Sequence, residues 1–581
     1  MEPPALTPSA RANNRRVAAV LYEVAELLNA KGERFKPQAY AKAARAVETL
    51  QEDVAAVSGR GELEEIPGVG THIAAKIREV VETGGLAYLE KLQQDLPAGV
   101  RELSEVEGIG PKRAQVLAKE LGITTVRGLE EAATAGRVRD LPGFGEQSEK
   151  RILATLKARQ GGGTRFLLGD ILPVADGIVA QLGRNPATRR ISVAGSIRRR
   201  KETIGDVDIV ATSLAPESVM AAFCSLPEVG RVVERGPTRS SVVLNSGLQV
   251  DLRVVEEGQY GAALLYFTGS KEHNIALRRR ALGQGRKLNE YGITDTSSGA
   301  VIAGNDEEGM YRALDLPYIE PELRENRGEI AAAEGGTLPV VIPYGAVKGD
   351  LHIHTAWSDG TGTVPEMAGA AQALGYEYVA VCDHAKGPQF PRGLDETAIA
   401  RQREEIGQVN RALDGLTVLA GIECSIKDDG SLDIGKKTLQ DLDVVVAGVH
   451  ADLQMEERAM TERLLAALHN EHIDILAHPT GRILLQREPM RSDLAAIAEA
   501  AAGLGVFLEI NAHPGRLDLP DTGCMAAREH GVKFAIGSDA HTKEGLRSME
   551  LGVATARRGW LAAGDVINTQ APKELRRMLG S

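Results

Sequence analysis

The sequence has few cysteines, no long apolar run and no excess of basic side chains. Each of these features would have marked a particular class of protein. Only four of its 581 residues are cysteines, none in CxxC spacing, and the N-terminus lacks a signal-peptide pattern. We therefore expect no disulfide framework and a cytoplasmic location. No apolar run approaches the roughly 18–20 residues that span a bilayer, which excludes a membrane protein. The net charge of −12, taken whole, argues against a nucleic-acid binder.

The charge is unevenly distributed along the chain. Residues 351–581 hold 23 basic and 33 acidic side chains, a net −10, whereas residues 1–350 hold 45 and 47, a net −2. Within the first part, residues 151–300 carry 21 basic against 14 acidic groups, a net +7, and ten of the twelve histidines lie beyond residue 350. A chain of this size folds into several domains, and the uneven distribution indicates two different chemistries.

A short pattern recurs three times in the first 160 residues: an apolar residue, a Gly-x-Gly core, and a polar, alanine-rich helical stretch. Such a core can make a tight turn that leaves backbone N–H groups at a helix N-terminus free to hold an anion. A single copy is more easily explained as a glycine helix cap, but three copies favour phosphate binding. They resemble helix-hairpin-helix motifs, which bind the DNA backbone and can hold a monovalent cation at the turn. The glycines concerned are Gly68, Gly70, Gly108, Gly110, Gly143 and Gly145.

After a glycine-rich linker, the sequence alternates like a mixed β-sheet. The expected strands span residues 191–194, 207–211, 231–234, 241–244 and 248–254. Asp206 and Asp208 stand at positions i and i+2 of one strand and therefore point the same way, and Asp251 on a later strand can complete a set of three. Mg²⁺ prefers oxygen ligands, and two such ions can hold both the attacking and the leaving oxygen of a phosphoryl transfer. An isolated Asp-x-Asp is more often a solvated strand end than a metal site. The neighbouring sequence therefore decides between these two interpretations.

That context is a Gly-Ser turn followed by arginines at 195–200, and a Tyr-Phe-Thr-Gly-Ser segment at 266–270. Both resemble the family X DNA polymerases, the polymerase beta family. The resemblance implies Mg²⁺ ligands at Asp206, Asp208 and Asp251, with Asp251 helping to deprotonate the primer 3′-hydroxyl. It also implies contacts to the triphosphate, the sugar and the minor-groove side of the new base pair. The triphosphate contacts are Ser196, Arg199, Gly205 and Arg165, and the other nucleotide contacts are Tyr266, Phe267, Gly269, Asn274 and Arg278.

Two segments near the N-terminus, residues 34–45 and 66–77, are similar to the DNA-end domain of the same family, in which lysines bind a 5′-phosphate and one can form a Schiff base with an abasic sugar. By position Lys76 would be the nucleophile, supported by Lys36 and Tyr40. A lysine needs a depressed pKa for this role. His72 stands where the lyase members carry a phosphate-binding lysine. The alternative, that Lys76 is a solvated helix lysine, stays open.

From residue 347 onward, short apolar strands alternate with helices, the rhythm of a βα barrel. Metal-capable side chains follow nearly every strand, and in such a barrel they converge on one face. Mixed imidazole and carboxylate ligands suit zinc, manganese or iron. The set resembles the polymerase and histidinol phosphatase (PHP) domain, a distorted seven-stranded barrel that binds up to three metals, with Glu423 bridging. The nine filled positions are His352, His354, Asp359, His384, Glu423, His450, His478, Asp539 and His541.

We therefore expect a multidomain α+β and α/β protein: a DNA repair polymerase that fills short gaps, with a PHP-domain 3′-5′ exonuclease that can also nick abasic sites. Its partners are gapped or nicked DNA and deoxynucleoside triphosphates, not membranes. Two alternatives stay open, a DNA-end-binding scaffold with a structural metal domain and a small-molecule phosphomonoesterase. The expected parts are a DNA-end domain (1–96), a second helix-hairpin-helix part (97–160), the palm (161–258), the thumb (259–325), a linker (326–345) and the PHP domain (346–581).

Overall fold

The computed structural model forms two compact units, residues 1–164 and 165–581. Among the described residues, no helix has both the length and the apolar character needed to cross a membrane. The structure describes residues 8–580 except for 31–32, 34–35, 49, 51, 84–85, 95–102, 104–108, 110, 124, 142–143, 146–147, 150–151 and 154–164.

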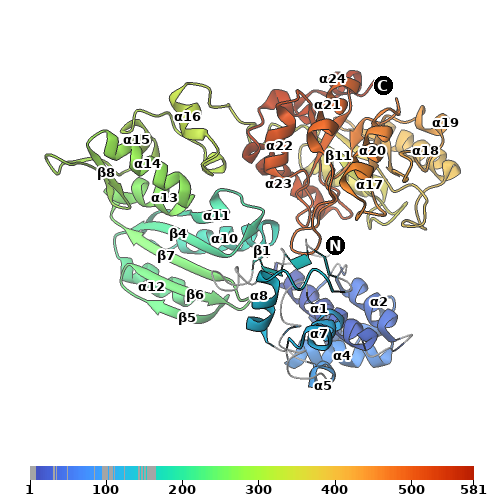
Figure 1. Cartoon of the computed structure of the whole chain (residues 1–581), viewed down its shortest axis with the longest axis horizontal. Coiled ribbons are helices and arrows are strands. Elements are labelled where there is room, and N and C mark those ends of the chain that lie inside the picture. Colours follow the sequence, from blue (N-terminus) through green and yellow to red (C-terminus); the bar gives the residue numbers. More distant parts are fainter. Residues whose placement is uncertain are drawn as a thin grey trace. The chain divides into compact units, whose positions relative to one another are not determined.

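The first unit is helical, and its described helices share one buried apolar core (blue in Figure 1). The core is built from the apolar faces of amphipathic helices, with Leu21 of the first helix and Ile77 of the fourth fully buried. The helices are α1 (Pro8–Ala30), α2 (Lys36–Glu48), α3 (Val54–Arg60), α4 (Thr71–Thr83), α5 (Ala87–Gln94), α7 (Pro111–Leu121) and α8 (Val126–Thr134).

The first glycine repeat lies where the sequence pattern places it, directly before a helix. Gly68 has a φ of +88°, the left-handed conformation that favours glycine, and α4 starts one residue after Gly70. Helix α7 starts directly after Gly110, so the second repeat is also followed by a helix. Gly145 is described and half-buried, whereas Gly108, Gly110 and Gly143 lie outside the described residues.

The second unit begins with a five-stranded mixed sheet in the order β2-β4-β7-β6-β5. Only the central pair β4 and β7 is parallel; the other three pairs are antiparallel. All five strands predicted from the sequence are present. The elements of this part are β1 (Phe166–Leu167), α10 (Leu168–Gly183), β2 (Thr188–Val193), α11 (Gly195–Arg198), β3 (Thr203–Ile204), β4 (Asp206–Ser213), α12 (Pro216–Cys224), β5 (Val229–Arg235), β6 (Arg239–Leu244) and β7 (Gln249–Val255).

Residues 260–345 form a smaller lobe with its own apolar core and a three-stranded sheet. A buried charge cluster joins it to the mixed sheet: the carboxylate of Glu307 accepts hydrogen bonds from Arg198 and from Arg324, which is fully buried. The two guanidinium groups outweigh the burial and lower the pKa of Glu307 to about 2. The elements are α13 (Tyr260–Thr268), α14 (Lys271–Gly283), β8 (Arg286–Asn289), β9 (Gly292–Asp295), β10 (Val301–Ala303), α15 (Glu307–Arg312) and α16 (Glu329–Glu334).

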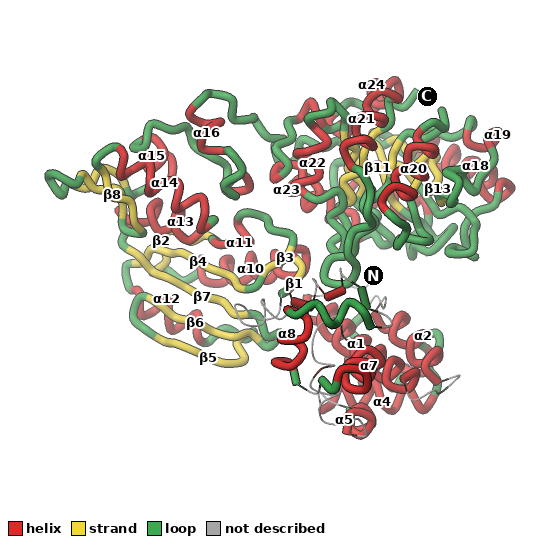
Figure 2. Tube along the Cα trace, in the orientation of Figure 1, coloured by secondary structure: helices red, strands yellow, loops and turns green. Residues whose placement is uncertain are grey.

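The C-terminal part is a βα barrel of seven parallel strands in sequence order (Figure 2). Its first and last strands meet where His354 N donates to Ala540 O at 2.9 Å and Asp539 N donates to His352 O at 2.8 Å. The strands are β11 (Gly349–Ile353), β12 (Tyr378–Val381), β13 (Thr417–Ser425), β14 (Val444–Gly448), β15 (Ile475–Leu476), β16 (Phe507–Asn511) and β17 (Phe534–Gly537). The helices are α17 (Val364–Ala373), α18 (Glu396–Ala412), α19 (Lys436–Leu439), α20 (Glu457–Leu468), α21 (Leu494–Leu504), α22 (Asp521–Arg528), α23 (Met549–Arg558) and α24 (Pro572–Met578).

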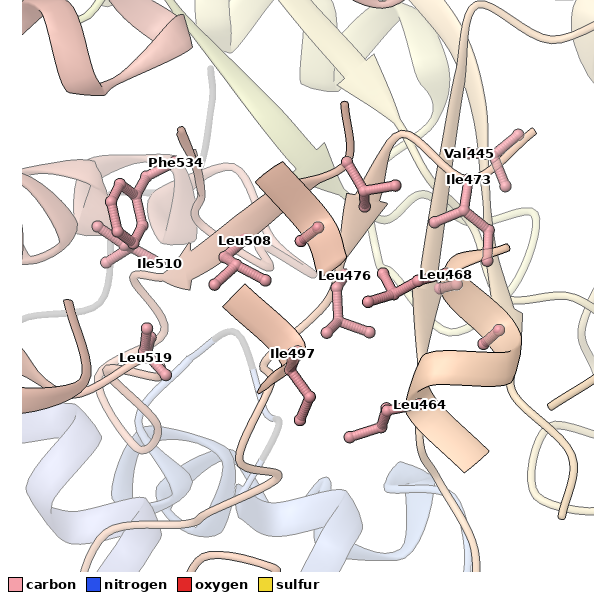
Figure 3. Close-up of a cluster of buried hydrophobic side chains, with 14 of the residues drawn as sticks. Val445, Leu464, Leu468, Ile473, Leu476, Ile497, Leu508, Ile510, Leu519 and Phe534 are labelled. Atoms are coloured by element: carbon pink, nitrogen blue, oxygen red, sulfur yellow. The ribbon is translucent and has the colours of Figure 1, made fainter. Parts of the chain in front are cut away.

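Apolar side chains between the strands and the surrounding helices hold the barrel together. Figure 3 shows Leu464 of α20 and Ile497 of α21 in one cluster of buried side chains with Leu476 and Leu508 of the neighbouring strands β15 and β16. Each of these buried side chains contributes roughly 1.5–3 kcal/mol relative to full exposure. A rigid barrel results, and residues at the carboxyl ends of its strands have fixed positions.

Candidate functional site

Strand pairing brings the three predicted aspartates together. Asp208 on β4 lies directly opposite Asp251 on β7, and Asp206 points from the same face of β4 two residues earlier. Asp251 is held from both sides, since the Ser241 hydroxyl donates to Oδ1 and the Gln249 amide donates to Oδ2 at 2.9 Å. The sheet itself therefore fixes the spacing of these carboxylates.

The electrostatics of this carboxylate group favour a divalent cation. Burial, together with the charges of Asp206 and Asp251, raises the pKa of Asp208 to about 7. Burial and the charge of Asp251 also raise the pKa of Asp206. Two arginines, Arg253 and Arg199, only partly offset this repulsion. An oxygen-only set of like charges fits Mg²⁺, whose charge offsets the repulsion.

The Gly-Ser turn lies directly beside the aspartates. Gly195 starts α11 with a φ of +65°, and a Cβ there would lie 2.7 Å from Oδ2 of Asp208, so only glycine fits. Ser196 is half-buried in the same short helix. Arg165 donates from Nε to the Thr203 hydroxyl at 2.9 Å, and its charge opposes the rise in the pKa of Asp206. Its Nη1 would lie 3.6 Å from a Cβ on Gly205, so Gly205 faces Arg165.

The Tyr-Phe segment ends helix α13 above the sheet. The rings of Tyr266 and Phe267 meet edge to face with centroids 5.1 Å apart. The Arg253 guanidinium lies 4.4 Å from the Phe267 centroid, which links this segment to strand β7, and the Arg278 guanidinium lies 5.4 Å from the Tyr266 centroid. Asn274 donates to Tyr266 O at 2.7 Å, so its position depends on the turn that also contains Gly269. The structure thus gathers the predicted sugar and base contacts in one place.

The predicted DNA-end residues are only partly gathered. Lys76 of α4 is half-buried, with Nζ 4.4 Å from the ring centroid of Tyr88, and Tyr88 stacks on buried Tyr40. Burial raises the pKa of Tyr40 to about 12, so its hydroxyl stays protonated at neutral pH. Lys36 is exposed and pairs with Glu33 at 3.1 Å, and His72 is exposed one helical turn before Lys76.

The nine predicted metal ligands of the barrel converge, and Glu423 is at their centre. Its Oε1 lies 3.1 Å from His450 Nε2 and 3.0 Å from His478 Nε2. Its Oε2 lies 2.8, 3.4 and 3.5 Å from ring nitrogens of His384, His352 and His354. Three groups have ligand atoms within 4.8 Å of one another: His354, Asp359, His384 and His541; His352, His354 and Asp539; and His384, Glu423 and His450.

The hydrogen bonding of this cluster fits metal ions. His384 Nδ1 and Glu423 Oε2 are 2.8 Å apart yet make no hydrogen bond, and the buried Nδ1 atoms of His354 and His478 have no hydrogen-bond partner. Ligands of a shared ion approach one another in this way without bonding. Burial and the neighbouring histidines His541 and His384 lower the pKa of His354 to about 3, which keeps it in the neutral form that binds metals.

Several supporting residues were missed by sequence reasoning. The Glu509 carboxylate accepts from His352 Nδ1 at 2.6 Å and from the backbone N–H of His478 at 2.6 Å. The Phe390 ring stacks on His384 at a centroid distance of 3.4 Å and meets His450 edge to face at 4.9 Å. The nearby His513 is exposed and its Nδ1 accepts from the Gly515 N–H, so it takes no part in this cluster, and no sequence periodicity marks Phe390.

Comparison with known family models identifies four regions of the chain. Family models match a helix-hairpin-helix domain at residues 12–86, a SAM-like helix-hairpin-helix tandem at 100–158, the DNA polymerase beta thumb at 263–325 and the PHP domain at 350–513.

Curated relatives cover the chain in whole and in part. The DNA polymerase/3′-5′ exonuclease PolX of Bacillus subtilis is 35% identical over 98% of this chain and 99% of its own length. DNA polymerase lambda of Rattus norvegicus is 28% identical over 54% of this chain and 56% of its own. A probable phosphatase of Caldanaerobacter subterraneus is 30% identical over 33% of this chain and 75% of its own. The chain therefore belongs to the family X DNA polymerases of the PolX type, in which a polymerase beta-like core is joined to a PHP domain.

Proposed function

We propose that this protein fills short gaps in damaged DNA by nucleotidyl transfer and trims 3′ ends in its PHP domain. The observation that carries the proposal is that both predicted sites are assembled in one chain. The carboxylates of Asp206, Asp208 and Asp251 project from paired strands, and eight other ligand-type side chains converge around Glu423. Divalent metals are required in both parts, Mg²⁺ in the first and up to three Mn²⁺ or Zn²⁺ ions in the second.

In the polymerase site, the three aspartates hold Mg²⁺, which supplies charge stabilisation for the attacking and leaving oxygens. The primer 3′-oxygen forms a bond to the α-phosphorus of the deoxynucleoside triphosphate, and pyrophosphate leaves. Asp251 helps to take the proton of the 3′-hydroxyl. Ser196, Arg199, Gly205 and Arg165 contact the triphosphate, Tyr266 and Phe267 press on the sugar, and Asn274 and Arg278 face the minor-groove side of the new pair.

In the PHP site, the histidine and carboxylate side chains would hold metal ions, whose chemistry there would be to activate water for attack on a phosphodiester. His354 is kept neutral by its neighbours and so remains available as a ligand. The Glu509 carboxylate orients the His352 ring and the backbone at His478. The face of barrel strand ends is where a DNA 3′ end would enter.

The helical first unit would hold gapped or nicked DNA through backbone amides at its hairpins, with a monovalent cation at each turn. Lys76 would act as the lyase nucleophile if the site also binds a 5′-phosphate. The lysine ammonium packs against the Tyr88 ring, which in turn stacks on Tyr40, so these contacts support the position of Lys76 on the helix. Borohydride trapping of wild type and Lys76→Ala on abasic DNA tests this part, and equal trapping would contradict it.

A second function has an observation in its favour, because a relative that matches only about a third of the chain is a probable phosphatase. In that alternative the PHP domain removes a phosphate from a small phosphomonoester. Rates on p-nitrophenyl phosphate and on a single-stranded oligonucleotide distinguish the two. We expect the oligonucleotide to be cleaved much faster per active site.

One assay tests the main proposal. Wild type, Asp206→Ala and the double variant His352→Ala/His354→Ala are compared on one gapped substrate, first with Mg²⁺ and then with Mn²⁺. Asp206→Ala should abolish extension and spare 3′ trimming, and the histidine variant should do the reverse. Extension by Asp206→Ala would refute the aspartate assignment. Trimming by the histidine variant would refute the PHP assignment.

A further inference from the structure

The basic run that follows the Gly-Ser turn is held from two sides. Arg198 pairs with Glu307 and Arg199 with Glu325, both in the thumb lobe. The next positions turn to the PHP barrel: Arg200 pairs with Glu550 of α23, and Glu202 receives two hydrogen bonds from Arg482. Apolar packing continues this contact, since Leu517 and Leu551 of the barrel belong to the apolar core of the palm.

Arg199 is of special interest because it is the proposed triphosphate contact. Its Nε donates to Oε1 of Glu325 at 3.0 Å and its Nη1 donates to Thr268 O, so its guanidinium is already engaged. Glu325 is shared, since Nη1 of Arg558 in the PHP barrel also donates to its Oε1 at 3.0 Å. The same Nη1 donates to Arg199 O at 2.6 Å, and Nη2 bonds to Asp521. Arg558 is only 4% exposed, so this contact is well shielded from water.

The charges around Glu325 determine what happens when one of its two arginine partners moves away. Burial opposes its ionisation, but Arg558, Arg199 and Lys201 together lower the pKa of Glu325, so it is a carboxylate in the folded protein. A triphosphate has to draw the Arg199 side chain away from this carboxylate. Glu325 can give up Arg199 at low cost only if another cation stays bound to it, because an unpaired buried charge is costly. Arg558 stays bound, since Asp521 and Arg199 O also hold it.

We propose that Arg558 of the PHP domain is a positioning residue of the polymerase site, which keeps Glu325 paired so that Arg199 can turn to the incoming triphosphate. The inference rests on the proposed role of Arg199. It makes nucleotide binding in the polymerase depend on a residue of the nuclease domain, 359 positions after Arg199 in the chain.

Steady-state kinetics of the full-length protein test the proposal on gapped DNA with Mg²⁺ and the correct deoxynucleoside triphosphate. In Arg558→Met, Glu325 depends on Arg199 and Lys201 for compensation, so we expect KM for the nucleotide to rise about tenfold with a smaller change in kcat. Adding Glu325→Gln to this variant removes the competing carboxylate and should return KM to within about twofold of wild type. A merely structural defect would not be rescued by a second buried substitution.

The neighbouring Arg557 provides the matched control. It lies on the same helix, is similarly buried and bonds to Glu322, but does not reach Arg199 or Glu325. Arg557→Met should therefore leave the nucleotide KM unchanged. An equal rise in this control, an unchanged KM in Arg558→Met, or a double variant without rescue would each overturn the proposal.

Two further variants separate the possible failures. Arg558→Lys keeps a positive charge in the buried site but cannot reach all three of its acceptors, so KM should rise by a smaller factor and again be restored by Glu325→Gln. If Arg558→Met does not fold and Arg558→Lys matches wild type, the proposal is wrong. Arg199→Ala reports on the proposed function itself: an unchanged KM there would refute the triphosphate role of Arg199 and, with it, the inference.

Discussion

Substituting Glu509 tests the proposed metal centre without replacing any of the nine proposed ligands. In Glu509→Gln one carboxylate oxygen becomes an amide nitrogen, so the side chain can no longer accept from both His352 Nδ1 and the His478 N–H, each of which lies at 2.6 Å in the structure. Losing such a partner of a ligand typically weakens metal binding about 10- to 100-fold. That range corresponds to roughly 1.4–2.7 kcal/mol of binding free energy.

The assay is calorimetric titration of Mn²⁺ into chelator-treated full-length protein, with the Mn²⁺-induced rise in the thermal midpoint as a second readout. Exonuclease activity should recover at high Mn²⁺, because the ligands themselves are intact. Glu405→Gln is the control: this carboxylate accepts from Trp357 Nε1 at 2.7 Å in the same domain and contacts none of the nine proposed ligands. Unchanged Mn²⁺ affinity in Glu509→Gln, or an equal loss in the control, would refute the reasoning.

Three more expectations follow from buried charges and from the charge distribution. Glu307→Gln leaves Arg324 buried without its carboxylate, which should lower the free energy of unfolding by about 3–5 kcal/mol and lower the urea midpoint. Because the folded pKa of Glu307 is about 2, its stabilisation should be present above about pH 4.5 and lost as the pH falls towards 2. Burial raises the pKa of Asp474 to about 7, so its stabilising contribution falls as the pH rises from about 4 through 7; Asp474→Asn should match wild type near pH 4 and exceed its thermal midpoint at pH 8, and a pH-independent difference would contradict this. DNA affinity, measured by fluorescence anisotropy, should fall at least about tenfold between roughly 50 and 200 mM salt, and a flat salt response would disprove backbone-dominated binding.

The sequence predicted most of what depends on local pattern. All five palm strands and six of the seven barrel strands were visible as short apolar runs. The remaining strand, β11, was less evident because the polar residues Asp350 and His352 interrupt it; here a proposed ligand, His352, lies on the strand itself and is buried. Alternation also predicted that Asp206 and Asp208 point the same way, whereas the pairing of Asp208 with Asp251 is known only from the folded sheet.

The residues that could not be predicted from the sequence are those whose role depends on contacts between distant segments of the chain. Glu509 is unremarkable on its strand until the barrel closes and brings His352 against it. Phe390 comes from a loop with no periodicity, and Arg558 sits on a helix whose partner Glu325 lies in another lobe. Residues 326–345, expected as a linker, contain helix α16, whose Glu329 is buried against His273. Apolar periodicity carries no information about such contacts.

The seam between the first and last barrel strands has a consequence for protein synthesis. Asp539 and His541 complete the metal cluster next to His352 and His354, which precede them by almost the whole domain. The polymerase aspartates, in contrast, are all present once residue 251 has been made. A chain that stops before β17 would therefore retain the three aspartates but lack both Arg558 and an intact PHP ligand set. Metal bound at the PHP site is thus a measure of how much of the protein has been completed.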